Sequence, residues 1–298
     1  MTTADGSHAG SVPAAGGSHA GSAGGHAESA PATDRLVSVL GAGRRPPSPG
    51  ALSNAAAFGW RALLKIKHAP EQLIDATLFP IMLTLTFTYL LGGAIAGSSG
   101  AYLQYLLPGI MTNSVLLITM YTGVALNTDL GKGVFDRFRT LSIWRPAPIV
   151  GYLLGDLVRY AVTAVVIMVV GLVLGFRPGG GIAGVAGGLA LLLLFSFAFS
   201  WIWTMFGLLL GSAKSVMGIS TMLLFPLTFL SNVYVAPETM PGWLQAVVGI
   251  NPVTHLVSAV RAAVAGRWDG SEVTWVLVAA AVCVAVFGTA TMRLYNRK

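Results

Sequence analysis

The residues best suited to chemistry in this sequence lie in one polar stretch between two long apolar runs. The stretch extends from Asn127 to Pro148 and reads NTDLGKGVFDRFRTLSIWRPAP. It holds basic and acidic side chains with aromatic residues at its centre, a mixture that suits docking to a soluble partner. The alternative is a positively charged loop that only fixes the orientation of the chain in a membrane.

Helical periodicity gives this stretch a more definite form. From Gly133 to Leu141 the apolar side chains Phe135, Phe138 and Leu141 fall on one side of a helix, and the charged ones fall elsewhere. The pattern predicts a short amphipathic helix along the membrane surface. Its candidate contact residues are Phe135, Asp136, Arg137, Phe138 and Arg139.

The composition predicts an integral membrane protein. Of the 298 residues, 54% are hydrophobic and only 10% are charged, whereas soluble proteins average roughly 25% charged residues. The net charge of +7 is explained by anchoring to anionic lipid and by orientation, and nothing supports nucleic-acid binding. The single cysteine, Cys283, lies in an apolar run, so the sequence offers no disulfide framework and no thiolate metal site.

Residues 1–50 form a low-complexity tail in which GSHAG occurs twice. Abundant Gly, Ser, Ala and Pro without apolar periodicity predict disorder, because such a segment cannot bury enough surface to offset its chain entropy. His8, His19 and His26 are weak metal-ligand candidates, since their spacing is irregular and no carboxylate or thiolate cluster accompanies them. No apolar core follows the first Met, so a secretory signal is not expected.

Residues 51–70 are predicted to form an amphipathic helix in the headgroup plane of the membrane. Trp60 lies on its apolar face, Arg61 and Lys65 lie on its basic face, and Pro70 ends it. Residues 71–298 then form the membrane domain, with six expected spans. The criterion for a span is a run of roughly 20 apolar residues, the length of helix that crosses a bilayer. The expected spans are 73–91, 108–126, 149–176, 182–210, 216–230 and 273–292.

The segment 231–272 between the last two expected spans is semi-apolar but is interrupted by proline and glycine. We therefore expect short re-entrant or interfacial helices there, not a full crossing. Trp243 is expected to dip into the outer leaflet, and Asn251 with Pro252 is expected to break the chain before the next helix. The fold class is thus all-α, with a coupling helix between spans 2 and 3 and re-entrant helices before span 6.

The distribution of basic residues predicts the orientation. Most of the lysines and arginines lie in the N-terminal region, in the 127–148 stretch, at Lys214 and in the C-terminal tail. Only Arg177, Arg261 and Arg267 lie on the other side. Because positive residues stay in the cytoplasm, both termini are predicted to be cytoplasmic, in a multi-pass protein of a bacterial plasma membrane.

Two charged residues fall inside the third expected span. Asp156 and Arg159 are three positions apart, a spacing that lets them pair on one helix face. Charges inside a span are functional candidates. Because we place this pair near the cytosolic boundary, structural pairing is favoured over a role in substrate passage, which stays open.

Several catalytic classes lack their motifs. There is no GxxxxGK[ST], so the chain cannot hydrolyse ATP through a P-loop, and there is no HExxH or GxSxG. The acidic residues are expected at span edges, which weakens a proton-driven carrier without excluding it. No catalytic residue and no bound cofactor is expected.

Two blocks of the sequence resemble type-2 ABC exporter permeases, particularly the daunorubicin-resistance permease family of bacteria. The first is DLGKGVFDRFRTL at Asp129 to Leu141, followed by GDLVR at Gly155 to Arg159. The second is VAPETMPGWL at Val235 to Leu244, which leads into NPVTHLVSAVRA at Asn251 to Ala262. The resemblance extends from about Ala51 onward.

The resemblance implies a pair of cytosolic ATPase subunits that carry ATP and Mg²⁺, and a second permease copy or a related permease. Phe135 and Phe138 would seat in a groove of the ATPase, with Asp136, Arg137 and Arg139 at its rim. The implied activity is export of a lipophilic drug or lipid-like substrate.

The substrate path and the class of transport both have alternatives. Phe79, Tyr89, Met111, Phe225 and Phe229 could line a lateral path, although aromatic and Met side chains at helical spacing more often only pack. The alternative function is a secondary carrier, channel or membrane scaffold that needs no ATPase.

Overall fold

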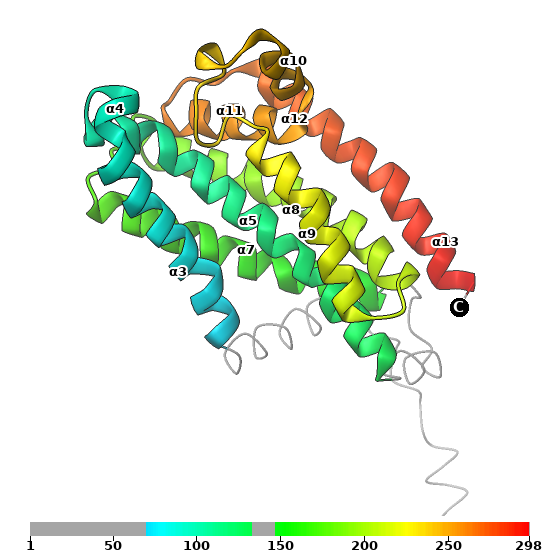
Figure 1. The fold of residues 1–298 in the computed structure, drawn as a ribbon. Helices are drawn as coiled ribbons and strands as arrows, with labels where there is room; N and C mark the ends of the chain where they lie inside the picture. Colours follow the sequence, from blue (N-terminus) through cyan, green and yellow to red (C-terminus); the bar gives the residue numbers. More distant parts are fainter. Residues whose placement is uncertain (1–69, 133–146, 298) are drawn as a thin grey trace, which may run out of the picture. The chain divides into compact units, whose positions relative to one another are not determined.

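The structure is a computed structural model that describes residues 70–132 and 147–297, all within one compact unit, Pro49–Lys298. The described part is all-helical, as expected (Figure 1). Its long helices are α3 (Pro70–Thr86), α5 (Ser99–Gly131), α7 (Ala147–Val173), α8 (Gly181–Leu209), α9 (Ala213–Phe229) and α12 (Gly270–Cys283). Its shorter helices are the π-helices η1 (Phe87–Leu91) and η3 (Val284–Gly288), the 3-10 helix η2 (Pro237–Thr239), α4 (Gly92–Ala96), α10 (Gly242–Ile250), α11 (Pro252–Val264) and α13 (Thr289–Arg297).

Five helical segments of the described chain are long and apolar enough to cross a membrane. They are Thr77–Ala96, Ser99–Gly131, Ile149–Val173, Gly181–Leu209 and Gly270–Asn296. The pair α10 and α11 would add a sixth only if it crossed as one bent span. The fifth expected span corresponds to α9, a shorter apolar helix of 17 residues, or about 26 Å. The chain is therefore a multi-pass membrane protein with five or six candidate spans.

Helix α5 is the centre of the bundle, with contacts to α3, α7, α8, α9 and α11 (Figure 1). Its 33 residues correspond to about 50 Å of helix. Most of its central side chains are buried, including Leu106, Val115 and Leu116 at 0% exposure. A helix that is apolar on all sides and surrounded by other helices is the core element of a membrane bundle.

Helices α5 and α8 cross where glycines allow their backbones to touch. A Cβ atom on Gly123 would lie 2.3 Å from the Trp203 carbonyl oxygen, and one on Gly207 would lie 2.6 Å from the Gly123 oxygen. Both distances are far below contact, so only glycine fits either position. Small residues at helix crossings replace the hydrophobic driving force that lipid does not supply.

Helix α5 is longer at both ends than the expected second span. The stretch 92–105, expected as a loop, is α4 and the first turns of α5. Ser98 caps α5 by accepting a hydrogen bond from the backbone N–H of Ala101, and Pro108 lies inside the helix. At the other end, the helix includes Asn127, which we expected in the polar loop, because the Asn127 side chain is buried against α8.

The chain between α9 and α12 is broken as the prolines predicted. Helices α10 and α11 meet at Asn251 with a bend of 80°. Asn251 caps α11 by accepting from the backbone N–H of Val253, and Pro252 occupies the first turn, where its missing N–H costs nothing. Both helices lie at the same end of the bundle as α4 (Figure 1).

Candidate functional site

The expected partner-contact residues, Phe135 to Arg139, lie outside the described residues, as do Trp60, Arg61 and Lys65 and the histidines of the tail. The structure does describe the two helices that hold the segment 133–146. Helix α5 ends at Gly131 and α7 begins at Ala147. The candidate coupling segment is thus covalently attached to the central helix of the bundle and to one of its packed neighbours.

Asn127 anchors the end of α5 just before that segment. Its side-chain amide donates to the carbonyl oxygens of Gly207 at 2.9 Å and Leu210 at 2.6 Å. The last carbonyls of α8 have no intrahelical donor, so the Asn127 amide supplies the missing partner. The two helix ends are therefore joined directly beside the candidate coupling segment.

A network of polar side chains joins α5, α7 and α8 inside the bundle. We call it the charge-pair network: Thr122, Asp156, Arg159, Tyr160 and Ser200. Arg159 Nη2 lies 3.0 Å from Asp156 Oδ1, and both side chains are largely buried. The Thr122 hydroxyl donates to Asp156 Oδ2 at 2.5 Å and lies 2.7 Å from the Tyr160 hydroxyl. Tyr160 Oη is in turn 2.9 Å from Ser200 Oγ.

The ion pair lies deeper than expected. Arg159 is 12 positions after the first residue of α7, about 18 Å along the helix axis, and Asp156 is about 14 Å along it. The expectation that the pair and the Asp156 carboxylate lie at the span boundary is therefore wrong. Helix α7 begins only two residues before the expected span, so the expected bounds already placed the pair well inside the helix, and Arg159 is only 8% exposed.

The hydrogen bonds between this buried ion pair and α5 fix the two helices to each other. Separating two charges in a low-dielectric interior is costly, and the Thr122 hydroxyl satisfies the second carboxylate oxygen of Asp156. Arg159 also points to the Ile118 carbonyl oxygen on α5, at 3.4 Å. Both charges therefore interact with α5, so α5 and α7 are expected to move together.

A second polar network lies around residues 230–236, which we call the connector because they join α9 to η2. The connector network is Tyr102, Tyr105, Asn232, Tyr234 and Arg261. The Tyr102 hydroxyl donates to the Tyr234 carbonyl oxygen, and the Tyr105 hydroxyl donates to the Asn232 carbonyl oxygen, both at 2.9 Å. Both tyrosines lie on α5, so the central helix holds this non-helical segment by its backbone.

Arg261 of α11 binds the same segment. Its Nε donates to the Tyr105 carbonyl oxygen and its Nη2 to the Asn232 carbonyl oxygen, each at 3.1 Å. The guanidinium lies over the Tyr105 ring, 3.8 Å from its centroid. No ion pair involves Arg261 within the described ranges, so neutral acceptors and one ring face stabilise its charge.

Tyr234 adds a neutral side chain to the connector. Its hydroxyl accepts a hydrogen bond from the Asn113 amide of α5 at 3.0 Å. Burial, and secondarily the nearby Tyr102, raise the pKa of Tyr234 to about 12, so its hydroxyl stays protonated at neutral pH. The connector is thus held to α5 without a titrating group of its own.

Asn251 has a second role besides capping α11. Its amide nitrogen donates to the Leu227 carbonyl oxygen at 2.7 Å and to the Leu230 carbonyl oxygen at 2.6 Å, the C-terminal end of α9. The break between α10 and α11 is therefore fastened to α9. Trp243 of α10 is 70% exposed, as expected for a residue that faces lipid or the interface.

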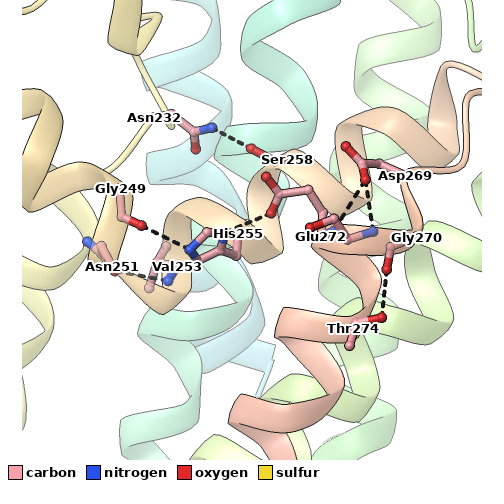
Figure 2. A network of polar contacts seen from close by, with 11 residues as sticks. Asn232, Gly249, Asn251, Val253, His255, Ser258, Asp269, Gly270, Glu272 and Thr274 are labelled. Atoms are coloured by element: carbon pink, nitrogen blue, oxygen red, sulfur yellow. Dashed lines mark hydrogen bonds and ion pairs between the residues drawn. The ribbon is translucent and has the colours of Figure 1, made fainter.

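Figure 2 shows how His255 of α11 joins α10 and α12. Its Nδ1 lies 2.7 Å from Glu272 Oε2, and its Nε2 lies 3.0 Å from the Gly249 carbonyl oxygen. The ring also stacks on Trp275, with centroids 5.0 Å apart. Both ring nitrogens face acceptors, so the arrangement is fully satisfied when the imidazole is doubly protonated.

In the described part of the chain, no cluster of acidic, His or Cys side chains could hold a metal ion.

The candidate substrate-path residues divide into two groups. Phe79, Tyr89, Phe225 and Phe229 are more than half exposed on α3, η1 and α9. Met111 is 2% exposed inside α5, so it packs in the core and cannot line a lateral path.

Sequence reasoning missed the roles of Asn127, Tyr102, Tyr105 and Arg261. Their partners are mostly backbone carbonyls far away in the chain, as for Arg261 and Tyr105. The available signal for Arg261 was its isolation, since an arginine amid Val and Ala in a late helix requires a buried acceptor.

Comparisons with known proteins agree with this architecture. The ABC-2 type transporter family matches residues 54–265. A daunorubicin resistance ABC transporter permease protein of Streptomyces coeruleorubidus is 48% identical over 90% of this chain and 95% of its own length. A probable doxorubicin resistance ABC transporter permease protein of Mycobacterium tuberculosis is 24% identical over 79% of this chain and 88% of its own. The inner membrane transport permease YadH of Escherichia coli is 29% identical over 66% of this chain and 79% of its own length. The resemblance seen in the sequence is confirmed, and the chain belongs to the ABC-2 type transporter family.

Proposed function

We propose that the chain is the membrane permease of an ATP-driven exporter that moves a lipophilic drug or lipid-like compound out across the plasma membrane. The observation that carries the proposal is the 48% identity with a daunorubicin resistance permease along nearly the full length of both chains. ATP hydrolysis then takes place on a separate pair of ATPase subunits, consistent with the missing P-loop motif. A second permease copy or a related permease completes the assembly.

The helix contacts supply a route for coupling. The segment 133–146 docks on the ATPase through Phe135 and Phe138, and any displacement of it pulls on α5 and α7 together. The charge-pair network holds these two helices to each other. At its other end α5 holds the connector through Tyr102 and Tyr105. Helix α5 therefore links the ATPase-facing segment to the opposite end of the bundle.

ATP binding would act on this route by shifting a two-state equilibrium. In one state the connector carbonyls accept from α5 and α11, as the structure has them. In the other state some of these bonds are broken and a path opens toward the outside. The connector can change shape without breaking helical hydrogen bonds, because it lies between two helices.

The proposed substrate class follows from the exposed apolar faces of α3 and α9. Phe225 and Phe229 stack at 4.2 Å between ring centroids, and both are half exposed. A planar aromatic compound that enters from the bilayer would find matching surfaces there. Simple packing against lipid or against a second permease remains the competing role for these side chains.

The experiment that tests the function uses inside-out vesicles that contain the chain and the ATPase recovered with it by mild-detergent purification. We expect ATP-dependent accumulation of a fluorescent anthracycline, and none with a non-hydrolysable nucleotide. The rival, a carrier that needs no ATPase, draws support from the depth of Asp156 in α7. It predicts accumulation that follows a proton gradient and continues without ATP, a result that would refute our proposal.

The orientation is tested separately. We propose that both termini and the segment 133–146 are cytoplasmic and that the α10–α11 end faces outward. Glu238→Cys and Asp269→Cys should then react with a membrane-impermeant thiol reagent added to intact cells. A Cys283→Ser background removes the single native thiol. Labelling only in inside-out vesicles would reverse the topology.

A further inference from the structure

A groove lies between α8 and the last helical segments of the chain, outside both networks described above. Its volume is about 530 Å³, and its lining includes Trp201 of α8 and residues of η3 and α13. The lining residues that matter here are Trp201, Ala285, Gly288, Thr289, Arg293 and Asn296. This groove is not needed for the proposed coupling route, so its function requires a separate explanation.

The shape of the groove comes from small residues on a widened helical turn. Segment η3 is a π-helix, and Gly288 and Ala285 leave its side toward α8 without bulky side chains. The nearest atoms to a Cβ on Gly288 would be those of Trp201 and Val284, at 3.7 Å. This is ordinary contact, so glycine is not required there by a clash. Gly288 thus packs against Trp201 at the floor of the groove, and the open part of the groove lies beside the exposed Ala285.

The polarity of the lining changes along the helix. Val284, Ala285 and Gly288 are apolar, whereas Thr289, Arg293 and Asn296 carry polar groups toward the C-terminus. Val284 and Arg293 are nine residue steps apart, which corresponds to about 14 Å of helix. That length equals about half of a 30 Å hydrocarbon core, the depth of a single leaflet. The groove thus has the dimensions and the polarity of one acyl chain below its headgroup.

The charged end of the groove has no counter-ion among the described residues. Arg293 is exposed, and no ion pair involves it in the part of the chain that is described. Its neighbours Leu294 and Tyr295 pack against α5 and α8 at Leu126 and Leu208, which fixes α13 at the end where α5 approaches segment 133–146. An exposed arginine near the end of the last candidate span, with a carboxamide one turn away, is suited to a phosphate group.

We propose that this groove binds an anionic phospholipid of the leaflet that contains Arg293, with its phosphate on Arg293 and Asn296 and an acyl chain along Ala285 and Gly288. Within the orientation proposed above, this is the cytoplasmic leaflet. The bound lipid would cover the groove between α8 and the last helical segments of the chain. The site would make the stability of this helix pair depend on the lipid composition of the membrane.

The test measures lipid retained by the purified, delipidated full-length chain, by native mass spectrometry, after titration with phosphatidylglycerol or phosphatidylcholine of identical acyl chains. We expect tighter binding of phosphatidylglycerol. Arg293→Gln should weaken that binding about fivefold, the effect of one lost charge at a membrane surface, and should leave phosphatidylcholine unchanged. Lys214→Gln removes an exposed charge from the first turn of α9, away from the groove lining, and should bind as the unmodified chain does.

A second variant tests the apolar part of the groove. Ala285 is exposed, so Ala285→Trp should fill the groove without disturbing the core and should abolish the retention of both lipids. Thermal unfolding of each variant verifies the fold, and Val284→Trp replaces Ala285→Trp if the latter does not fold. Equal binding of the two lipids, an Arg293→Gln variant indistinguishable from Lys214→Gln, or no lipid on the full chain would each overturn the proposal. None of these readouts requires an ATPase, so they are independent of the proposed transport function.

Discussion

The charge-pair network and the connector network both use a buried arginine, but they use it differently. Arg159 is paired with a carboxylate on its own helix, and that carboxylate is bound by a side chain of α5. Arg261 is bound by two backbone carbonyls and an aromatic ring, and one of those carbonyls belongs to a non-helical segment. The first arrangement joins α7 to α5. The second joins α11 to α5 and to the non-helical connector.

The difference indicates which end of the bundle can move. Moving α5 away from α7 would remove the Thr122 and Ile118 hydrogen bonds from two buried charged groups, and a hydrogen bond to a charged group contributes about 1.5–3 kcal/mol. Releasing the connector breaks individual hydrogen bonds, each worth about 0.5–1.5 kcal/mol, or about 1.5–3 kcal/mol where Arg261 is the donor. A transport cycle driven from segment 133–146 should therefore keep α5 and α7 together and change the connector.

The largest expected effect is on stability at the charge-pair network. Asp156→Asn should lower the free energy of unfolding by about 3–5 kcal/mol, because Arg159 would stay buried without a counter-charge. Thermal unfolding in detergent measures the change. Asp129→Asn, at the less buried end of α5, is the matched control and should change stability by less than about 0.5 kcal/mol.

A second substitution sharpens this result. Combining Asp156→Asn with Arg159→Met removes both charges and should recover part of the lost stability. If Asp156→Asn and Asp129→Asn had equal, small effects, the pair would not hold α5 to α7 and the comparison of the two networks would fail.

An intermediate effect is expected at the connector. Arg261→Met removes two charge-assisted hydrogen bonds but also the cost of burying a charge, so the net loss of stability should be about 1.5–3 kcal/mol. Hydrogen–deuterium exchange should become faster at residues 230–236 and stay unchanged around Thr122. Arg267→Met, at an exposed arginine in the turn before α12, is the control. Faster exchange throughout α5 would show that the two networks are not separable.

The smallest effect is expected for a rim charge of the candidate coupling segment. Arg137→Glu should weaken retention of the ATPase by no more than about 1 kcal/mol, and the loss should shrink in high salt, because exposed charges are screened. Pull-downs at two salt concentrations measure it, with Lys214→Glu as the control. A loss that does not depend on salt would place Arg137 inside the interface, not at its rim.

Much of the fold could be predicted from local signals. The long apolar runs predicted the membrane helices, and the Asn251–Pro252 pair predicted the break between α10 and α11 because one residue caps and the other starts a helix. The start of α5 could not be predicted in this way. Its first turns are weakly apolar, and they are helical because Tyr102 and Leu103 pack in the core.

The site residues were predicted only where their partners are close in the chain. Asp156 and Arg159 are three positions apart, and helical periodicity predicts that side chains at this spacing can pair. Arg261 and Asn127 bind backbone carbonyls of other helices. Such contacts depend on the packing of the whole bundle, so no local sequence pattern predicts them.

The central claim is that an ATPase drives this permease through Phe135 and Phe138, and the double variant Phe135→Ala with Phe138→Ala tests it most directly. Buried aromatic anchors typically contribute about 2 kcal/mol or more each to an interface, so retention of the ATPase in a pull-down should fall more than tenfold. Membrane insertion, thermal stability and the accessibility of Glu238→Cys should stay unchanged. Full retention of the ATPase by the double variant would contradict the account.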